Sequence, residues 1–276
     1  MFKRSFGWYS MIIPRQSGTL ALTEGIIQHQ KLIFKIFQIN RMKKIKFYKI
    51  SYSIDPQITG QLPRHSDSQI NGFIDPENNS VERTDQYQYK GLTYIPEGID
   101  MHKFKADHNA KITDLMSSLF FASQGFFVSN KFNEILKSLI TSNIRAYGAT
   151  VFFHESPLDY YFLDFTRTSD IVDFNRSTFV ADHSAPAMRS GGEKVSVLSF
   201  EDYKEKGRLL RKEQGFAFEL IPVTLALNYP SDMLQFPFSG LKYVSEKLRQ
   251  KIEEEKLTGI VFEETDIEFF CCFQNY

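Results

Sequence analysis

A histidine and a glutamate stand side by side after an apolar run, and their types suit acid–base chemistry. His154 and Glu155 follow "ATVFF", and Asp159 comes shortly after them. An imidazole beside a carboxylate can move protons to and from a substrate at the end of a strand. The metalloprotease phrase HExxH needs a second histidine, which this segment lacks, and neither a glycine-rich turn nor a nucleophile accompanies the pair. We therefore expect a structural role for these residues and predict no catalytic residue.

Oxygen ligands are clustered in "TSDIVDFNRS", where Asp170, Asp173 and Asn175 have side chains that Ca²⁺ accepts. The segment lacks the central glycine and the terminal glutamate of an EF-hand, so turn formation and hydrogen bonding are the favoured roles. The segment "SGGEK", 190–194, resembles a phosphate-binding loop but lacks its upstream glycine spacing and its Lys-Ser/Thr ending. The six histidines are scattered and no CxxC pair is present. We predict neither a metal site nor a cofactor.

Acidic residues are concentrated near the C-terminal end, in "EEEK" and "EETDIE". The chain is neutral overall, but basic residues are in excess over residues 1–41, so the remainder is acidic. Nucleic-acid binding requires a basic surface and is not expected. The acidic segments are either a solvated helix face or a surface that docks a basic patch of another protein. In the second case the contact residues would be Glu253, Glu254, Glu255, Glu263, Glu264 and Asp266.

A phrase that occurs twice predicts how the elements are arranged. "FVSNKFNEIL" and "YVSEKLRQKI" each place a serine, Ser129 or Ser245, before a helical pattern of apolar residues. A serine hydroxyl at this position accepts from the unpaired N–H groups of the first helical turn. A short apolar run precedes each helix, and another follows it after a turn. We interpret the phrase as a divergent strand–helix–strand repeat, and the two serines as caps rather than nucleophiles.

The remaining segments predict an α+β fold with a mixed or mainly antiparallel sheet and flanking helices. After Met42 the pattern indicates a strand with Ile45, Phe47 and Ile50 on one side and Lys46, Lys49 and Ser51 on the other. Apolar spacing from Ile112 to Phe120 predicts a helix. Further elements are expected as a meander of strands over 149–179, a helix capped at Ser199, and a strand in "FAFELIPVTLAL".

The first 41 residues differ from the rest and contain the single Trp. We expect a leader, 1–41, that is disordered or is upstream sequence translated from an over-long gene, with Met42 as the initiator. An ordinary flexible extension is the alternative, and the intact mass of the natural product distinguishes the two. No apolar run approaches the roughly 20 residues that span a bilayer. The two cysteines, Cys271 and Cys272, are adjacent. The prediction is a cytoplasmic protein without membrane contact.

Three segments together resemble the immunity proteins of bacterial polymorphic toxin systems. They are "YYFLDFTRTSDIVDFNRSTF", the two capped phrases, and "SEKLRQKIEEEKLTGIVFEE". The chain is most similar to immunity family eleven, which is named after a myxobacterial protein and was formerly a domain of unknown function; family forty-three is a near neighbour. The resemblance covers about Lys43 to Glu264. Its motifs run from Asp170 to Phe179 and from Ser245 to Phe262.

The resemblance implies a single immunity-type α+β domain, 43–276, that is not an enzyme and uses no cofactor. Such a protein binds a cognate toxin domain in the cytoplasm of the producing cell and neutralises it. Two alternatives stay open. One is a small-molecule or peptide sensor with a Phe-lined pocket. The other is a hydrolase whose site is assembled from His154, Glu155, Asp170 and Asp173.

Overall fold

The computed structural model describes residues 42–61, 68–73, 103–118, 125–141, 144–165 and 169–272. The chain divides into two units, Met1–Met42 and Lys43–Tyr276, and the elements below belong to the second apart from Met42 itself. The predicted leader lies outside the described residues.

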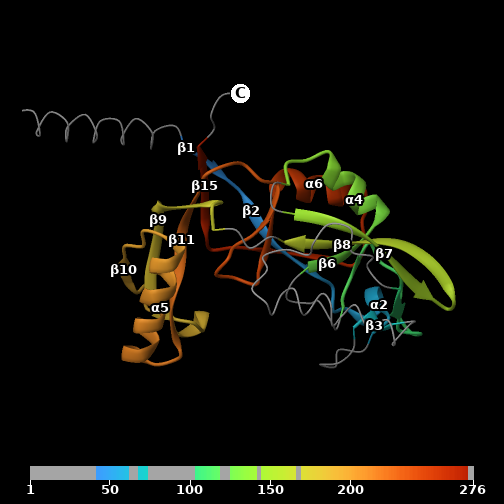
Figure 1. Cartoon of the computed structure of the whole chain (residues 1–276), viewed down its shortest axis with the longest axis horizontal. Coiled ribbons are helices and arrows are strands. Elements are labelled where there is room, and N and C mark those ends of the chain that lie inside the picture. Colours follow the sequence, from blue (N-terminus) through green and yellow to red (C-terminus); the bar gives the residue numbers. More distant parts are fainter. Residues whose placement is uncertain are drawn as a thin grey trace, which may run out of the picture. The chain divides into compact units, whose positions relative to one another are not determined.

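Three β-sheets and four α-helices make up the described part (Figure 1), which confirms the predicted α+β class. Sheets A and C mix parallel and antiparallel pairs, and sheet B is antiparallel throughout. Sheet A has the order β1 (Met42–Ile45), β15 (Glu268–Cys272), β11 (Phe218–Leu227), β9 (Val172–His183), β10 (Glu193–Val195). Sheet B has the order β12 (Met233–Gln235), β13 (Lys242–Ser245), β2 (Phe47–Tyr52), β14 (Ile260–Glu264). Sheet C has the order β3 (Ile70–Phe73), β4 (Lys103–Ala106), β7 (Ile144–Phe153), β8 (Ser156–Phe165), β6 (Gly125–Ser129), β5 (Leu115–Met116). The helices are α2 (Pro56–Thr59), α4 (Asn130–Lys137), α5 (Phe200–Gln214) and α6 (Glu246–Glu254), with a short 3₁₀ turn η1 (Pro186–Met188).

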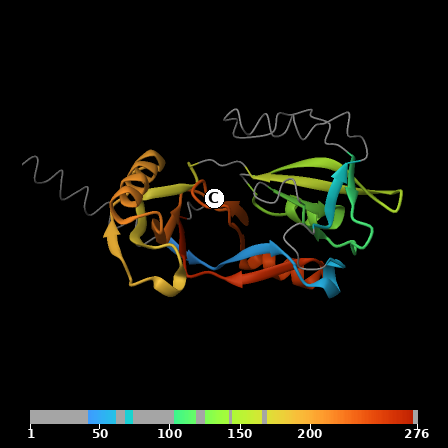
Figure 2. The same ribbon diagram turned by 90° about the horizontal axis from the view of Figure 1, so that it is seen from below.

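The predicted repeat is confirmed as two units of the same topology, β6–α4–β7 and β13–α6–β14. In each unit the two strands run antiparallel to a third strand that lies between them, β8 in sheet C and β2 in sheet B. The register is also the same. Tyr161 of β8 pairs with Val128 and Gly148, Tyr48 of β2 pairs with Val244 and Glu264, and the same length of chain separates the two partners in both units. Figure 2 shows β2, in blue, beside the red C-terminal strands. The central strand of the first unit, β8, follows that unit directly in the chain. The central strand of the second unit, β2, comes from near the start of the described chain, far ahead of the unit in sequence.

Each cap serine belongs to a polar contact that the two units share. The Ser129 hydroxyl accepts from the Phe132 N–H and donates to Asp114 Oδ1 at 2.7 Å. The equivalent Ser245 hydroxyl accepts from Leu248 N–H and donates to Asp232 Oδ1, also at 2.7 Å. These bonds confirm the capping role of both serines.

The second oxygen of each aspartate reaches across to the other unit. Asp114 Oδ2 accepts from the backbone N–H of Thr258, after α6, at 2.8 Å. Asp232 Oδ2 accepts from the N–H of Ile140, after α4, at 3.1 Å. Helices α4 and α6 lie side by side in Figure 1 and are in contact. Each aspartate therefore joins the start of its own helix to the end of the other, and the two units are tied together reciprocally.

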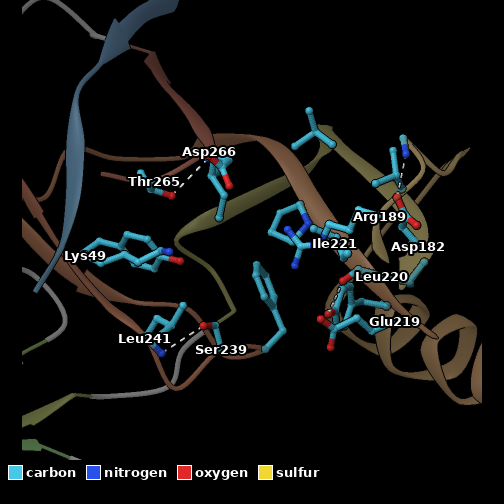
Figure 3. Close-up of a pocket in the computed structure, with 18 residues that line it drawn as sticks. Lys49, Asp182, Arg189, Glu219, Leu220, Ile221, Ser239, Leu241, Thr265 and Asp266 are labelled. Atoms are coloured by element: carbon cyan, nitrogen blue, oxygen red, sulfur yellow. Dashed lines mark hydrogen bonds between the residues drawn. The ribbon is translucent and has the colours of Figure 1, made fainter. Parts of the chain in front are cut away.

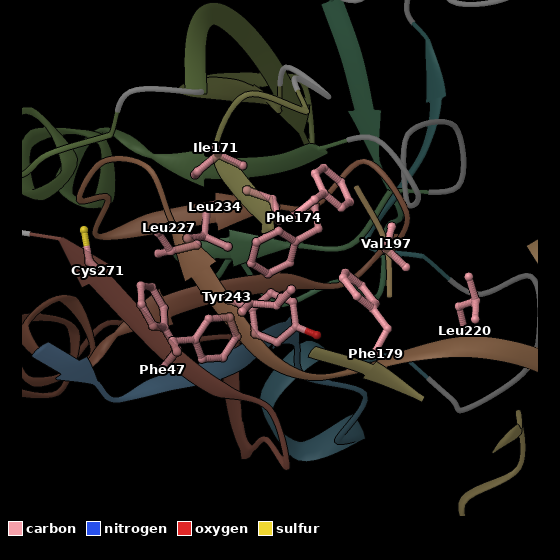
Figure 4. Close-up of a cluster of buried hydrophobic side chains, with 14 of the residues drawn as sticks. Phe47, Ile171, Phe174, Phe179, Val197, Leu220, Leu227, Leu234, Tyr243 and Cys271 are labelled. Carbon is pink, nitrogen blue, oxygen red and sulfur yellow. The ribbon is translucent and has the colours of Figure 1, made fainter. Parts of the chain in front are cut away.

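Three apolar clusters fill the spaces around these sheets. One contains α4, α6 and the facing side chains of sheets B and C, and a second covers the opposite face of sheet C. The third joins sheet A to the other face of sheet B (Figure 4) and is rich in aromatic rings. Its members include Phe47, Phe174, Phe179, Phe236, Tyr243 and Phe269. Strands β12 and β13 and the start of β2 are consequently buried on both faces, whereas β14 is partly or fully exposed.

Burial on both faces explains two wrong predictions. Over its described part, 112–118, the segment predicted as a helix is not helical: Leu115 and Met116 form β5, and they enter different clusters on opposite faces of sheet C. A doublet that is buried on both sides produces apolar spacing like that of a helix. In β2 the predicted sides are also wrong, because Phe47 shares the face of Lys49, and Ile50 packs on the other face.

Candidate functional site

A cavity of about 520 Å³ lies between sheets A and B (Figure 3). Its walls come from β2 and β13 on one side and from β9 and β11 on the other, with α5 and the loops before β13 and β15 completing them. The volume is within the range of about 300–1,000 Å³ that small-molecule sites occupy. This cavity is the strongest candidate site in the described part of the chain.

Aromatic rings form the floor of the cavity. The rings of Tyr203 and Phe238 have centroids 4.9 Å apart, and the buried ring of Tyr243 lines the same space. The Tyr203 hydroxyl donates to the Leu220 carbonyl at 2.9 Å. Burial raises the pKa of Tyr203 to about 12, and the nearby Glu219 charge acts in the same direction. Burial also raises the pKa of Tyr243 to about 12, so both phenols are neutral at physiological pH.

Asp182 and Arg189 line the cavity, but the loop between β9 and β10 uses both. The Asp182 carboxylate is buried and accepts from the backbone N–H groups of His183, Ser190 and Gly191 at 2.8–3.2 Å. These bonds, first that from His183, lower the pKa of Asp182. The Arg189 guanidinium donates to two carbonyl oxygens in the same loop. Two N–H groups of the "SGGEK" segment, those of Ser190 and Gly191, therefore do bind an anionic group, but that group is a side chain of this protein.

Two charged residues of the cavity wall remain without a partner among the residues that the structure describes. The side chain of Lys49, on β2, is partly buried and has no hydrogen bond or ion pair within those residues. Glu219, on β11, is likewise partly buried and unpaired within those ranges. Figure 3 places Lys49 on one side of the cavity and Glu219 on the other. The sequence analysis did not identify either residue as part of a site. Each is a polar residue between two apolar ones, which is the ordinary pattern of a half-buried strand.

The six carboxylates predicted to contact a partner are all exposed, but they form two groups. Glu253, Glu254 and Glu255 lie at the end of α6, and Glu263, Glu264 and Asp266 lie on β14 and the loop after it. Three of them have ion-pair partners: Glu253 contacts Arg249, Glu255 contacts Lys131, and Glu264 contacts Lys46. Within the described residues Glu254, Glu263 and Asp266 have none, and Asp266 also lines the cavity.

His154 and Glu155 form the two-residue turn between β7 and β8. Both have positive φ, 47° and 69°, and both are exposed. Asp159 is on β8, opposite Thr150, and the structure does not gather these side chains around a cavity. The geometry is that of a tight hairpin, in which two residues must adopt a left-handed conformation.

The oxygen-rich segment also has structural contacts. Asp173 pairs with Arg176 at 3.3 Å, and its carbonyl accepts from Ser177 within a bulged part of β9. The Asp170 carbonyl accepts from the Asn228 side chain, and Asn175 is exposed. In the described ranges no group of three or more His, Cys, Asp or Glu side chains is arranged to hold a metal ion.

Asp114 and Asp232 are further residues that the sequence analysis overlooked. A signal exists, since "DLM" and "DML" each place an aspartate before two apolar residues at a similar distance ahead of a cap serine.

None of the helices that the structure describes has the length and apolarity to cross a membrane. In comparisons with known proteins, the chain matches no family model and no curated protein sequence.

Proposed function

We propose that this protein is an immunity protein that binds a cognate bacterial toxin domain in the cytoplasm of the producing cell and blocks it. The observation that carries the proposal is the set of exposed carboxylates on α6, on β14 and in the loop after β14. Of these, Glu254, Glu263 and Asp266 are not neutralised by a basic side chain in the described part of the chain. Unpaired surface charge accelerates encounter with a partner of opposite charge. It therefore supports a basic protein partner.

Two further features support the proposal. Of the segments that carry the family resemblance, the two capped phrases and the C-terminal segment lie in the two tied units, where their cap serines serve the scaffold. A scaffold that is cross-linked by such hydrogen bonds suits a protein that acts by binding, because preorganisation reduces the conformational entropy lost on association.

The test is co-expression in a bacterial host. The full chain is produced together with each toxin domain encoded beside its gene, and growth is measured. We expect one toxin to be neutralised, and the two proteins to elute as a stoichiometric complex in size-exclusion chromatography. Toxicity that persists with every such domain would contradict the proposal.

A charge-reversal variant locates the contact. Replacing Glu254 and Glu263 together by Lys should reduce the association rate constant for the toxin by about tenfold or more at low salt. The matched control is the double change of Glu205 and Glu213 to Lys on the exposed face of α5, which alters the net charge by the same amount and should leave the rate unchanged. Equal effects of the two changes would show that only net charge matters and would remove α6 and β14 from the interface.

A further inference from the structure

The two tied units provide an internal reference for the wall of the cavity. In sheet C, Phe127 pairs with Phe162, and in sheet B the equivalent pair is Tyr243 with Lys49. Phe162 is fully buried in the core of its sheet. Sheet B thus has an ammonium group where its counterpart has a core ring. A lysine there weakens packing, and its charge is costly to bury without a partner.

The two sheets also differ at the residue on the other side of Lys49, where sheet B has a charged residue and sheet C has an aromatic one. Lys49 is opposite Glu263 on β14, and the equivalent residue in sheet C is Tyr147, opposite Phe162. Lys49 and Glu263 form no ion pair, and Glu263 is exposed whereas Lys49 is partly buried at the cavity. The cross-strand carboxylate therefore leaves the ammonium group available to a molecule in the cavity.

The opposite wall presents one negatively charged side chain that likewise has no partner within the described residues. Asp182 is saturated by backbone donors, and Arg189 is bound to carbonyl oxygens. Asp266 is at the exposed rim. Glu219 is left as the unpaired charge on the side of the cavity away from Lys49 (Figure 3). The rings of Tyr203, Phe238 and Tyr243 line the same cavity.

We propose that this cavity is a binding site for a small amphoteric ligand of the short-peptide class. Its anionic group binds Lys49, its cationic group binds Glu219, and its apolar or aromatic body packs on the aromatic rings that line the cavity. Two opposite charges with an aromatic floor favour such a molecule over a simple anion, which Glu219 would repel. The inference goes beyond toxin binding and does not depend on it.

The test compares peptides that differ only in their end charges. The full chain is titrated at low ionic strength, by isothermal titration calorimetry, with Phe-Phe and Phe-Ala-Phe bearing free termini. The same peptides are then used with an N-terminal acetyl group or with a C-terminal amide. We expect each capping group to weaken binding by about tenfold, the loss that one charge-assisted contact produces. A peptide with capped termini but Lys and Glu side chains tests whether an internal segment of a protein also binds.

Two variants assign the charges to the ends of the ligand. The Lys49→Met variant should bind the peptide with a C-terminal amide as tightly as the peptide with a free C-terminal carboxylate. The Glu219→Gln variant should bind the N-terminally acetylated peptide as tightly as the peptide with a free N-terminal amine. The matched control Lys204→Met, on exposed α5, should behave as the wild type. If a variant fails to fold, the comparison of free and capped peptides on the wild-type chain still tests whether the end charges of the ligand are recognised. Absence of binding by every peptide, or equal affinity for charged and capped forms, would overturn the proposal.

Discussion

At the scale of single residues, Asp182 occupies the place that a bound anion takes in a phosphate loop. Its carboxylate accepts from three backbone N–H groups and closes the loop between β9 and β10. These groups stabilise the ionised form and lower its pKa from the usual 3.8. The stabilisation is therefore present above the unfolded-state pKa and is lost as the pH falls through the lower folded-state value.

Because the pKa of Asp182 is lowered in the folded state, the effect of Asp182→Asn on stability should depend on pH. The variant should unfold at lower urea concentration than the wild type at pH 7, and the difference should close as the pH falls below about 4. Urea denaturation followed by circular dichroism over this pH range measures the effect. The control Asp159→Asn, at an exposed position of β8, should follow the wild type throughout. A difference that stays constant with pH would show that the charge of Asp182 is not what matters.

The turn at His154 and Glu155 leads to a second prediction. Each residue has positive φ, which costs a residue other than glycine about 1–2 kcal/mol. Asn-Gly is the favoured sequence for a two-residue turn of this kind. The double change His154→Asn with Glu155→Gly should raise the free energy of unfolding by about 1 kcal/mol, because glycine entropy offsets part of the gain. Glu155→Ala, which keeps the strain, should give no gain. A clear loss of stability would mean that the contact of the His154 ring with Phe153, whose ring centroids are 4.1 Å apart, outweighs the relief of strain.

At the scale of elements, Asp114 and Asp232 are expected to act together. Each accepts hydrogen bonds from both units, and a bond to a charged group contributes roughly 1.5–3 kcal/mol. Asp114→Ala and Asp232→Ala should each lower the free energy of unfolding by about 2 kcal/mol or more. The double variant should lose less than the two losses combined, because either change loosens the same junction between α4 and α6.

The control for this cycle is Asp202→Ala at the start of α5. Asp202 accepts from the Leu198 N–H at 2.8 Å and belongs to sheet A's helix, away from both tied units. Its effect should add to that of either aspartate. Additivity between Asp114 and Asp232 themselves would contradict a shared junction.

The same elements show what the sequence can predict. Ser129 and Ser245 begin helices that local patterns predict correctly, because capping and apolar spacing act within a few residues. The central strands β8 and β2 share register, but they stand at different places in the chain, so a search in sequence order does not align them. The β5 doublet fails for a similar reason, since its two faces are buried by segments far away in sequence.

The cavity is harder to predict still, because it exists only when sheets A and B meet. Lys49 and Glu219 come from distant strands, and each by itself reads as an ordinary polar residue between core positions. Their significance follows from the comparison of Lys49 with Phe162, which requires the register of both sheets. The acidic residues of α6 and β14 were visible in the sequence, but their division into paired and unpaired carboxylates was not.

At the scale of the whole unit, sheets B and C should unfold together. One apolar cluster contains side chains from both sheets and from α4 and α6, and the two aspartates add polar ties. The central strands β2 and β8 have strand neighbours on both sides. Their amides should therefore exchange with solvent hydrogen only through the same opening reaction, whereas β10, at the edge of sheet A, should exchange earlier.

Native-state hydrogen exchange with mass spectrometry, at increasing denaturant concentration, measures this directly. Peptides from β2 and β8 should give the same free energy of opening and the same dependence on denaturant. In the Asp114→Ala, Asp232→Ala double variant the two values should separate, because the ties that couple the sheets are gone while each sheet keeps its own hydrogen bonds. Exchange of β2 well before β8 in the wild type would mean that the N-terminal strand opens independently, and that the two units are joined by packing too weak to make them one cooperative body.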